Sequence, residues 1–228
     1  MVLEQPRSPK YFDEENARTD WRRIRFGATL AIYGGAVGAF AVLVNLLSRA
    51  PAYDLQRLEF GPSIVFGLSG FLAGSQLAGP TAYWSYGGLG FFYPKLRQAR
   101  GLLAWVFLGF AYGVVFPLLM GALFLPVTLV FVDFVQGLVS VPDLLYRMLA
   151  LASGAWPTLA VTVGFKLFFS GFIAGGLFAL GSWAIDYFNT SADPATAKYG
   201  AWAMALALSV LIIAVAAFGP LETLSKLG

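Results

Sequence analysis

The sequence predicts an all-α integral membrane protein, a polytopic helical bundle of about six transmembrane helices, several of them broken by proline or glycine. Long runs without a charged residue cover residues 26–48, 60–94, 101–132 and 199–221, and a fifth run, 148–185, carries only Lys166. An apolar helix of ~20 residues is long enough to cross the hydrocarbon core of a bilayer. Hydrophobic residues make up 58% of the 228 residues and charged residues 12%, whereas soluble domains carry about 25% charged residues. Mean hydropathy of +0.72 agrees with this class.

Three parts follow from the distribution of charge: a polar N-terminal arm at residues 1–25, a transmembrane domain at 26–221 and a short polar tail at 222–228. Two basic clusters flank the first apolar runs, namely Arg18, Arg22, Arg23 and Arg25, and then Lys95, Arg97 and Arg100. Lysine and arginine collect on the cytoplasmic side of membrane proteins. We therefore expect a multi-pass protein whose N-terminus and whose 95–100 loop are both cytoplasmic.

The first crossing is expected at Phe26–Leu47, where it acts as an uncleaved signal-anchor. The second is expected at Pro62–Ala78, because Gly79 and Pro80 interrupt the run that follows. The next residues, 81–93, are rich in aromatic residues and glycine. They are expected either to lie at the membrane interface, which Trp and Tyr favour, or to form a re-entrant segment covered by protein.

Two further crossings are expected at Leu102–Leu123 and Val127–Tyr146, separated near Pro126. In the second, polar side chains recur at offsets of 3, 7 and 14 residues, at Asp133, Gln136, Ser140 and Arg147. This spacing places them on one face of a helix. The segment is then either a tilted span with a polar stripe toward the protein interior or an amphipathic helix on the membrane surface.

The last two crossings are expected at Val161–Ile185 and Tyr199–Phe218, with Met148–Thr158 as a partly buried connection. Six crossings place both termini in the cytoplasm and the loop Asp186–Lys198 outside. Reporters fused after residues 97 and 192 are accordingly expected on opposite sides of the membrane. Five and seven crossings are open alternatives.

Small residues spaced by four predict faces where helices pack closely: Gly34 and Gly38, Gly70 and Gly74, and Gly171 and Gly175. The last two pairs belong to similar segments, Ser69–Gly74 and Ser170–Gly175, which lie 101 residues apart. This match indicates either two inverted halves of three helices each, as in many transporters, or chance similarity in a chain rich in Gly, Ala, Phe and Leu.

Lys166 is the one charged residue in the interior of the five long apolar runs, and it lies within the predicted span Val161–Ile185. At that depth a charge costs about 3 kcal/mol or more and normally has a partner; Asp133 is the first candidate and Asp186 the second. Three interpretations are open: an ion or substrate site, a charge pair that locks two helices, or a lysine at the tip of a hairpin that extends to the interface. A locking pair predicts that Lys166→Met is tolerated only together with Asp133→Asn.

The absence of His and Cys removes several classes of function. Without imidazole or thiolate we expect no haem, iron–sulfur cluster or zinc, and the only bound cofactors expected are lipids. No paired carboxylates, phosphate-binding glycine loop or serine–histidine arrangement predicts an enzyme. Acidic residues interleave with the N-terminal arginines, so nucleic acid is not an expected partner.

The sequence therefore favours a non-catalytic structural or accessory subunit of a larger membrane complex. Its expected partners are membrane lipids and other membrane subunits, or further copies of the same chain. The alternative is a small-solute or ion transporter or channel, with a site around Lys166 and the polar stripe from Asp133 to Arg147. A lipid-modifying enzyme ranks third, because no active-site motif supports it.

Overall fold

The structure, a computed structural model, describes residues 9–47, 60–85, 102–150, 156–189, 191, 193 and 195–225. Side chains are described within narrower limits, which leave out residues 9–20, 22, 46–47, 60–63, 83–85, 102–103, 156–166 and 217–225. The described residues form helices joined by turns, with no strand among them. The expectation of an all-α chain is therefore confirmed.

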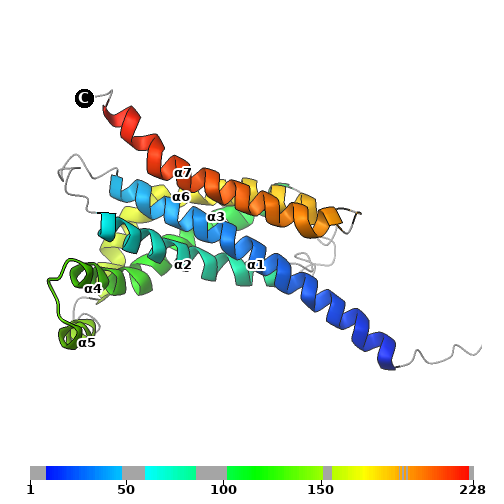
Figure 1. Cartoon of the computed structure of the whole chain (residues 1–228), viewed down its shortest axis with the longest axis horizontal. Coiled ribbons are helices and arrows are strands. Elements are labelled where there is room, and N and C mark those ends of the chain that lie inside the picture. Colours follow the sequence, from blue (N-terminus) through cyan, green and yellow to red (C-terminus); the bar gives the residue numbers. More distant parts are fainter. Residues whose placement is uncertain are drawn as a thin grey trace, which may run out of the picture.

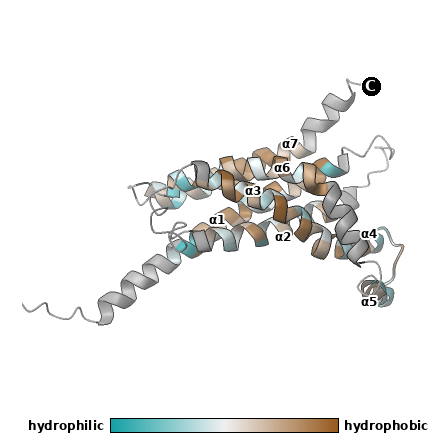
Figure 2. Ribbon diagram, turned by 180° about the vertical axis from the view of Figure 1, so that it is seen from behind, coloured by the Kyte–Doolittle hydropathy of each residue, from teal (hydrophilic) through white to brown (hydrophobic). Residues whose placement is uncertain are grey.

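Five long helical rods and one short helix make up the fold (Figure 1). In chain order they are α1 (Pro9–Leu47), α2 (Phe60–Ser85), α3 (Leu102–Leu119), a π-helical turn (Met120–Phe124), α4 (Leu125–Val135), α5 (Val141–Ala150), α6 (Trp156–Asn189), a second π-helical turn (Thr196–Gly200) and α7 (Ala201–Ser225). Four segments are long and apolar enough to cross a membrane: Arg23–Asn45, Ala104–Val135, Leu167–Asn189 and Thr196–Ala216. Figure 2 shows apolar residues along these rods.

The expected proline breaks are wrong at two places. Helix α2 continues through Pro80 to Ser85, and residues 104–135 form one rod through Pro117 and Pro126 instead of parts of two crossings. Two threonines that follow these prolines in the chain bind the carbonyl four residues earlier: the Thr81 hydroxyl donates to the Leu77 carbonyl and the Thr128 hydroxyl to the Phe124 carbonyl, both over 2.6 Å. In an apolar environment a local adjustment such as the π-helical turn Met120–Phe124 allows a helix to continue through proline.

Helices α1 and α2 are antiparallel and touch through their glycines. Gly38 and Gly70 approach so closely that a Cβ on Gly70 would lie 2.7 Å from the Gly38 carbonyl oxygen. One turn further along, a Cβ on Gly74 would collide with the Gly34 carbonyl oxygen. The Ser75 hydroxyl also donates to the Ala31 carbonyl across this contact, over 2.9 Å. The interface therefore has no room for a side chain at these four glycines.

Helices α3 and α6 form a second antiparallel pair of the same kind. A Cβ on Gly113 would lie 2.8 Å from the Gly171 carbonyl oxygen, and a Cβ on Gly175 would collide with the Gly109 carbonyl oxygen. The two similar segments, Ser69–Gly74 and Ser170–Gly175, thus occupy corresponding places, each in the second helix of a glycine-packed pair. This arrangement relates two antiparallel helix pairs, whereas one of the two interpretations of the match was a pair of inverted halves of three helices each.

Stacked aromatic rings fill the space between the two helix pairs. The rings of Tyr33, Phe178, Tyr112 and Phe116 follow one another with centroid separations of 6.3, 4.4 and 5.6 Å. Each tyrosine also joins two helices, because the Tyr33 hydroxyl donates to the Leu177 carbonyl over 2.5 Å and the Tyr112 hydroxyl to the Gly34 carbonyl over 2.7 Å. All four side chains are buried. They are called the aromatic column below.

The long rods alternate in direction, so their ends meet in two groups (Figure 1). At one end Phe26 of α1 packs against Trp105 of α3, with ring centroids 6.2 Å apart. The Trp105 indole N–H donates to the Asp186 carboxylate of α6 over 3.2 Å. Phe188 of α6 lies beside Gly200, the residue before the start of α7. The end of α6 and the start of α7 therefore lie at the same end of the bundle as the start of α3.

Candidate functional site

The predicted polar stripe does not lie on one helix. Helix α4 ends at Val135, and Gly137 follows with φ of +71°, a left-handed conformation that favours glycine. The Gly137 N–H donates to the Phe134 carbonyl over 3.0 Å and the Leu138 N–H to the Asp133 carbonyl over 2.9 Å. This pair of bonds is the Schellman motif, which closes a helix. The expected continuous helix Val127–Tyr146 is therefore wrong.

A second helix, α5, begins four residues later with its own cap. The Ser140 carbonyl accepts from the Leu144 N–H over 3.1 Å, and the Ser140 hydroxyl donates to the Asp143 carboxylate over 2.5 Å. Asp143 in the first turn and Arg147 in the last turn complement the helix dipole. Of the predicted stripe, Ser140 thus serves as a helix cap, while Gln136 is an exposed residue of the turn.

The turn brings Asp133 and Arg147 together. The Arg147 guanidinium donates to the Asp133 carboxylate over 2.8 Å, and the two side chains are 49% and 37% exposed. The continuous helix would have placed these two residues on one face but about four turns apart, so their contact follows from the turn and not from helical periodicity. Both charges lie at the end of the rod, and neither is enclosed by the bundle.

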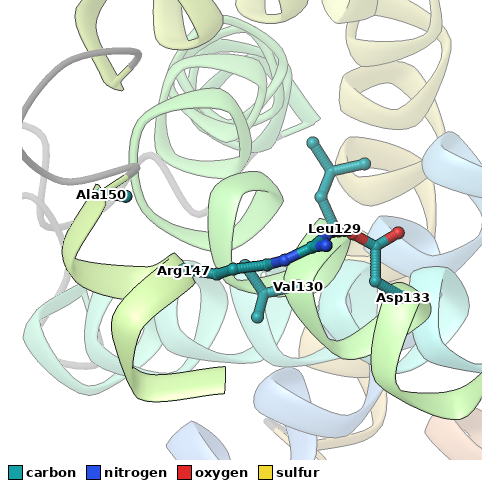
Figure 3. A pocket seen from close by; sticks show the side chains of 5 residues that line it. All are labelled: Leu129, Val130, Asp133, Arg147 and Ala150. Carbon is teal, nitrogen blue, oxygen red and sulfur yellow. Dashed lines mark hydrogen bonds and ion pairs between the residues drawn. The ribbon is translucent and has the colours of Figure 1, made fainter. Parts of the chain in front are cut away.

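A hollow lies between α4 and α5 around this ion pair (Figure 3). Its volume is about 460 Å³, and it is lined by Leu129, Val130, Asp133, Arg147 and Ala150. The lining combines one neutralised pair of charges with apolar side chains. Such a lining offers weak polar contacts to an amphipathic molecule but supplies no nucleophile and no acid–base pair.

Lys166 lies within α6, which is helical without interruption from Trp156 to Asn189. A hairpin turn at this residue is therefore not part of the fold. The Lys166 side chain lies outside the described residues. Of its two candidate partners, Asp133 pairs with Arg147, and Asp186 is buried and accepts the bond from Trp105.

Asp133→Asn and Arg147→Met are each expected to lower the free energy of unfolding by no more than about 1 kcal/mol, because exposed ion pairs contribute little. Thermal unfolding in detergent measures this. A loss of about 3–5 kcal/mol in Asp133→Asn, restored by adding Lys166→Met, would instead indicate a buried pair between these two residues.

Packing residues outside the prediction include Gly109 and Gly113, which share the spacing of Gly34 and Gly38 and were identifiable from it. Gly137 also carried a signal, since glycine is common just after the end of a helix. Among the side chains that the structure describes, no three carboxylates come together as a metal site. Comparisons of the chain with protein families, with curated proteins and with solved structures found no match.

Proposed function

We propose that this chain is a non-catalytic subunit of a larger membrane complex and that it serves as a helical scaffold. The aromatic column is the observation that carries the proposal. It occupies the space between the two helix pairs, where a solute path through the bundle would have to run. Because the helices on either side touch at glycine backbones, no change of side-chain rotamer opens these contacts. The chain is therefore better suited to hold a fixed shape than to alternate between two shapes.

The outer surface of the α3–α6 pair supports docking to another membrane protein. Phe107, Phe110, Phe169 and Phe172 are exposed there, by 51–79% of their surface. The rings of Phe110 and Phe172 meet across the pair, with centroids 6.0 Å apart. Aromatic residues are enriched at protein interfaces. Their rigid rings bury a large area with little loss of conformational freedom on binding.

Purification in mild detergent at native expression level tests the proposal. The chain is expected to elute with a second membrane protein at a constant ratio through two chromatographic steps. Phe110→Ala with Phe172→Ala is expected to reduce that ratio, whereas Leu206→Ala with Val210→Ala on the exposed face of α7 serves as the matched control. A chain that elutes alone as a monomer would contradict the proposal.

The alternating rods favour five crossings over six. Helix α2 has 26 residues, so it is about 39 Å long, which exceeds the ~30 Å hydrocarbon core. Added to the four other membrane-length rods, it makes five. Nine of the 15 lysines and arginines lie within residues 1–25 and 95–100, which favours a cytoplasmic location for both segments. With five crossings the α6–α7 loop is also cytoplasmic and the C-terminus lies outside.

A transporter or channel is the second candidate. The position of Lys166 within α6 favours it, because ionisable residues inside membrane spans commonly mark ion or substrate paths. Flux measured in vesicles that contain only this chain distinguishes the candidates. Solute flux through the unchanged chain that is lost in Lys166→Met would support transport. No flux through the unchanged chain would agree with a subunit.

A further inference from the structure

Helix α5 stands beside the bundle with one apolar face. Its apolar side chains recur at offsets of 3, 4, 7 and 8 residues, at Val141, Leu144, Leu145, Met148 and Leu149. Asp143 and Arg147 lie on the opposite side of the helix. We call the first group the apolar face of α5.

This face lies open in the structure. Val141, Leu145 and Leu149 are exposed by 70%, 68% and 62%, and no residue of α5 is buried. Leu138 in the preceding turn is 66% exposed, and Val135 at the end of α4 is 50% exposed. The apolar surface therefore continues from the membrane-length rod onto α5.

The direction of α5 suits a membrane surface. In Figure 1 the long rods run across the picture while α5 is seen nearly end-on, so its axis lies across theirs. The Schellman turn at Gly137, the Ser140 cap and the pair between Asp133 and Arg147 hold it in this direction. A helix fixed across the rods at the end of a membrane span is roughly parallel to the membrane plane.

We propose that α5 is an interfacial helix that rests in the headgroup layer with its apolar face toward the acyl chains. The inference rests on the membrane-spanning arrangement proposed above. Lipid is the occupant that the geometry favours, because the hydrocarbon boundary must pass near the end of α4. Amphipathic helices bind such boundaries by burying their apolar side. Asp143 then faces the headgroups and water, while Arg147 stays paired with Asp133 at the end of α4.

Site-directed spin labelling tests the proposal, and the chain has no cysteine that must first be removed. The full chain carries one label at Leu145→Cys or at Asp143→Cys in vesicles of phosphatidylcholine and phosphatidylglycerol. Collision rates with membrane-soluble oxygen and a water-soluble nickel chelate are compared. The ratio of oxygen to nickel collisions is expected to be several-fold higher at position 145 than at 143.

Leu180→Cys is the control, because Leu180 is 58% exposed in the middle of the span Leu167–Asn189. It should show high oxygen and low nickel access, and a failure there refutes the membrane arrangement itself. If the control behaves as expected, equal ratios at 145 and 143 would overturn the interfacial helix. Low access to both reagents at 145 would also overturn it, since protein would then cover the apolar face.

Discussion

Gly175→Leu is expected to prevent stable folding, whereas Gly176→Leu next to it is expected to be tolerated. A Cβ at Gly175 would collide with the Gly109 carbonyl oxygen and lie 3.1 Å from the Gly113 Cα, so α3 and α6 would have to separate. Overfilling a packed interface costs about 1–3 kcal/mol and occasionally more, and here backbone atoms oppose the added group. Nothing lies within 4 Å of a Cβ at Gly176. Replacing a glycine inside a helix by a better helix former raises the stability of the helix by up to about 1 kcal/mol.

Thermal unfolding and the yield of monodisperse protein in detergent compare the two variants. Because the residues are adjacent, membrane insertion and helix propensity are nearly matched between them. Equal losses in both variants would contradict the glycine-packed contact between α3 and α6.

Tyr112→Ala is expected to lower the free energy of unfolding by about 3–5 kcal/mol, the range for removing a large buried aromatic side chain. Tyr112 is 3% exposed, stacks on Phe178 with centroids 4.4 Å apart and binds the Gly34 carbonyl. Tyr112→Phe keeps the ring and loses only the hydroxyl, so we expect it to lower the free energy of unfolding by only about 0.5–1.5 kcal/mol.

Phe107→Ala is the control for this series, since Phe107 is on the same helix and is 65% exposed. Its unfolding temperature in detergent should stay close to that of the unchanged chain. A Tyr112→Ala variant as stable as Phe107→Ala would show that the aromatic column does not hold the helix pairs together.

Helix class and approximate spans could be predicted because they depend on local properties. A run without charge indicates a membrane span whatever it packs against, so the apolar spans within α1, α6 and α7 followed from composition, whereas the start of α1 at Pro9 and of α6 at Trp156 did not. The continuation through Pro80, Pro117 and Pro126 could not, because it depends on the environment. In water a proline inside a helix usually ends or kinks it, whereas in lipid an uncapped break is more costly than an adjusted helix.

The polar site was predicted in part. Asp133 and Arg147 were expected on one face of a continuous helix, where they would lie about four turns apart, whereas the turn at Gly137 brings them into contact. The aromatic column could not be predicted from the sequence, because Tyr33, Tyr112 and Phe178 come from three helices that are far apart along the chain. Periodicity marks which face of a helix is apolar, but it does not say which faces meet.

Reporter fusions after residues 97 and 192 test the five-crossing arrangement most directly. Residue 97 lies between α2 and α3 in the sequence and residue 192 between α6 and α7, and the described ends of these four helices lie at the same end of the bundle. Both reporters are predicted on the cytoplasmic side, with a third reporter at the C-terminus on the opposite side. Reporters at 97 and 192 on opposite sides of the membrane would contradict the five-crossing arrangement and return the chain to six crossings.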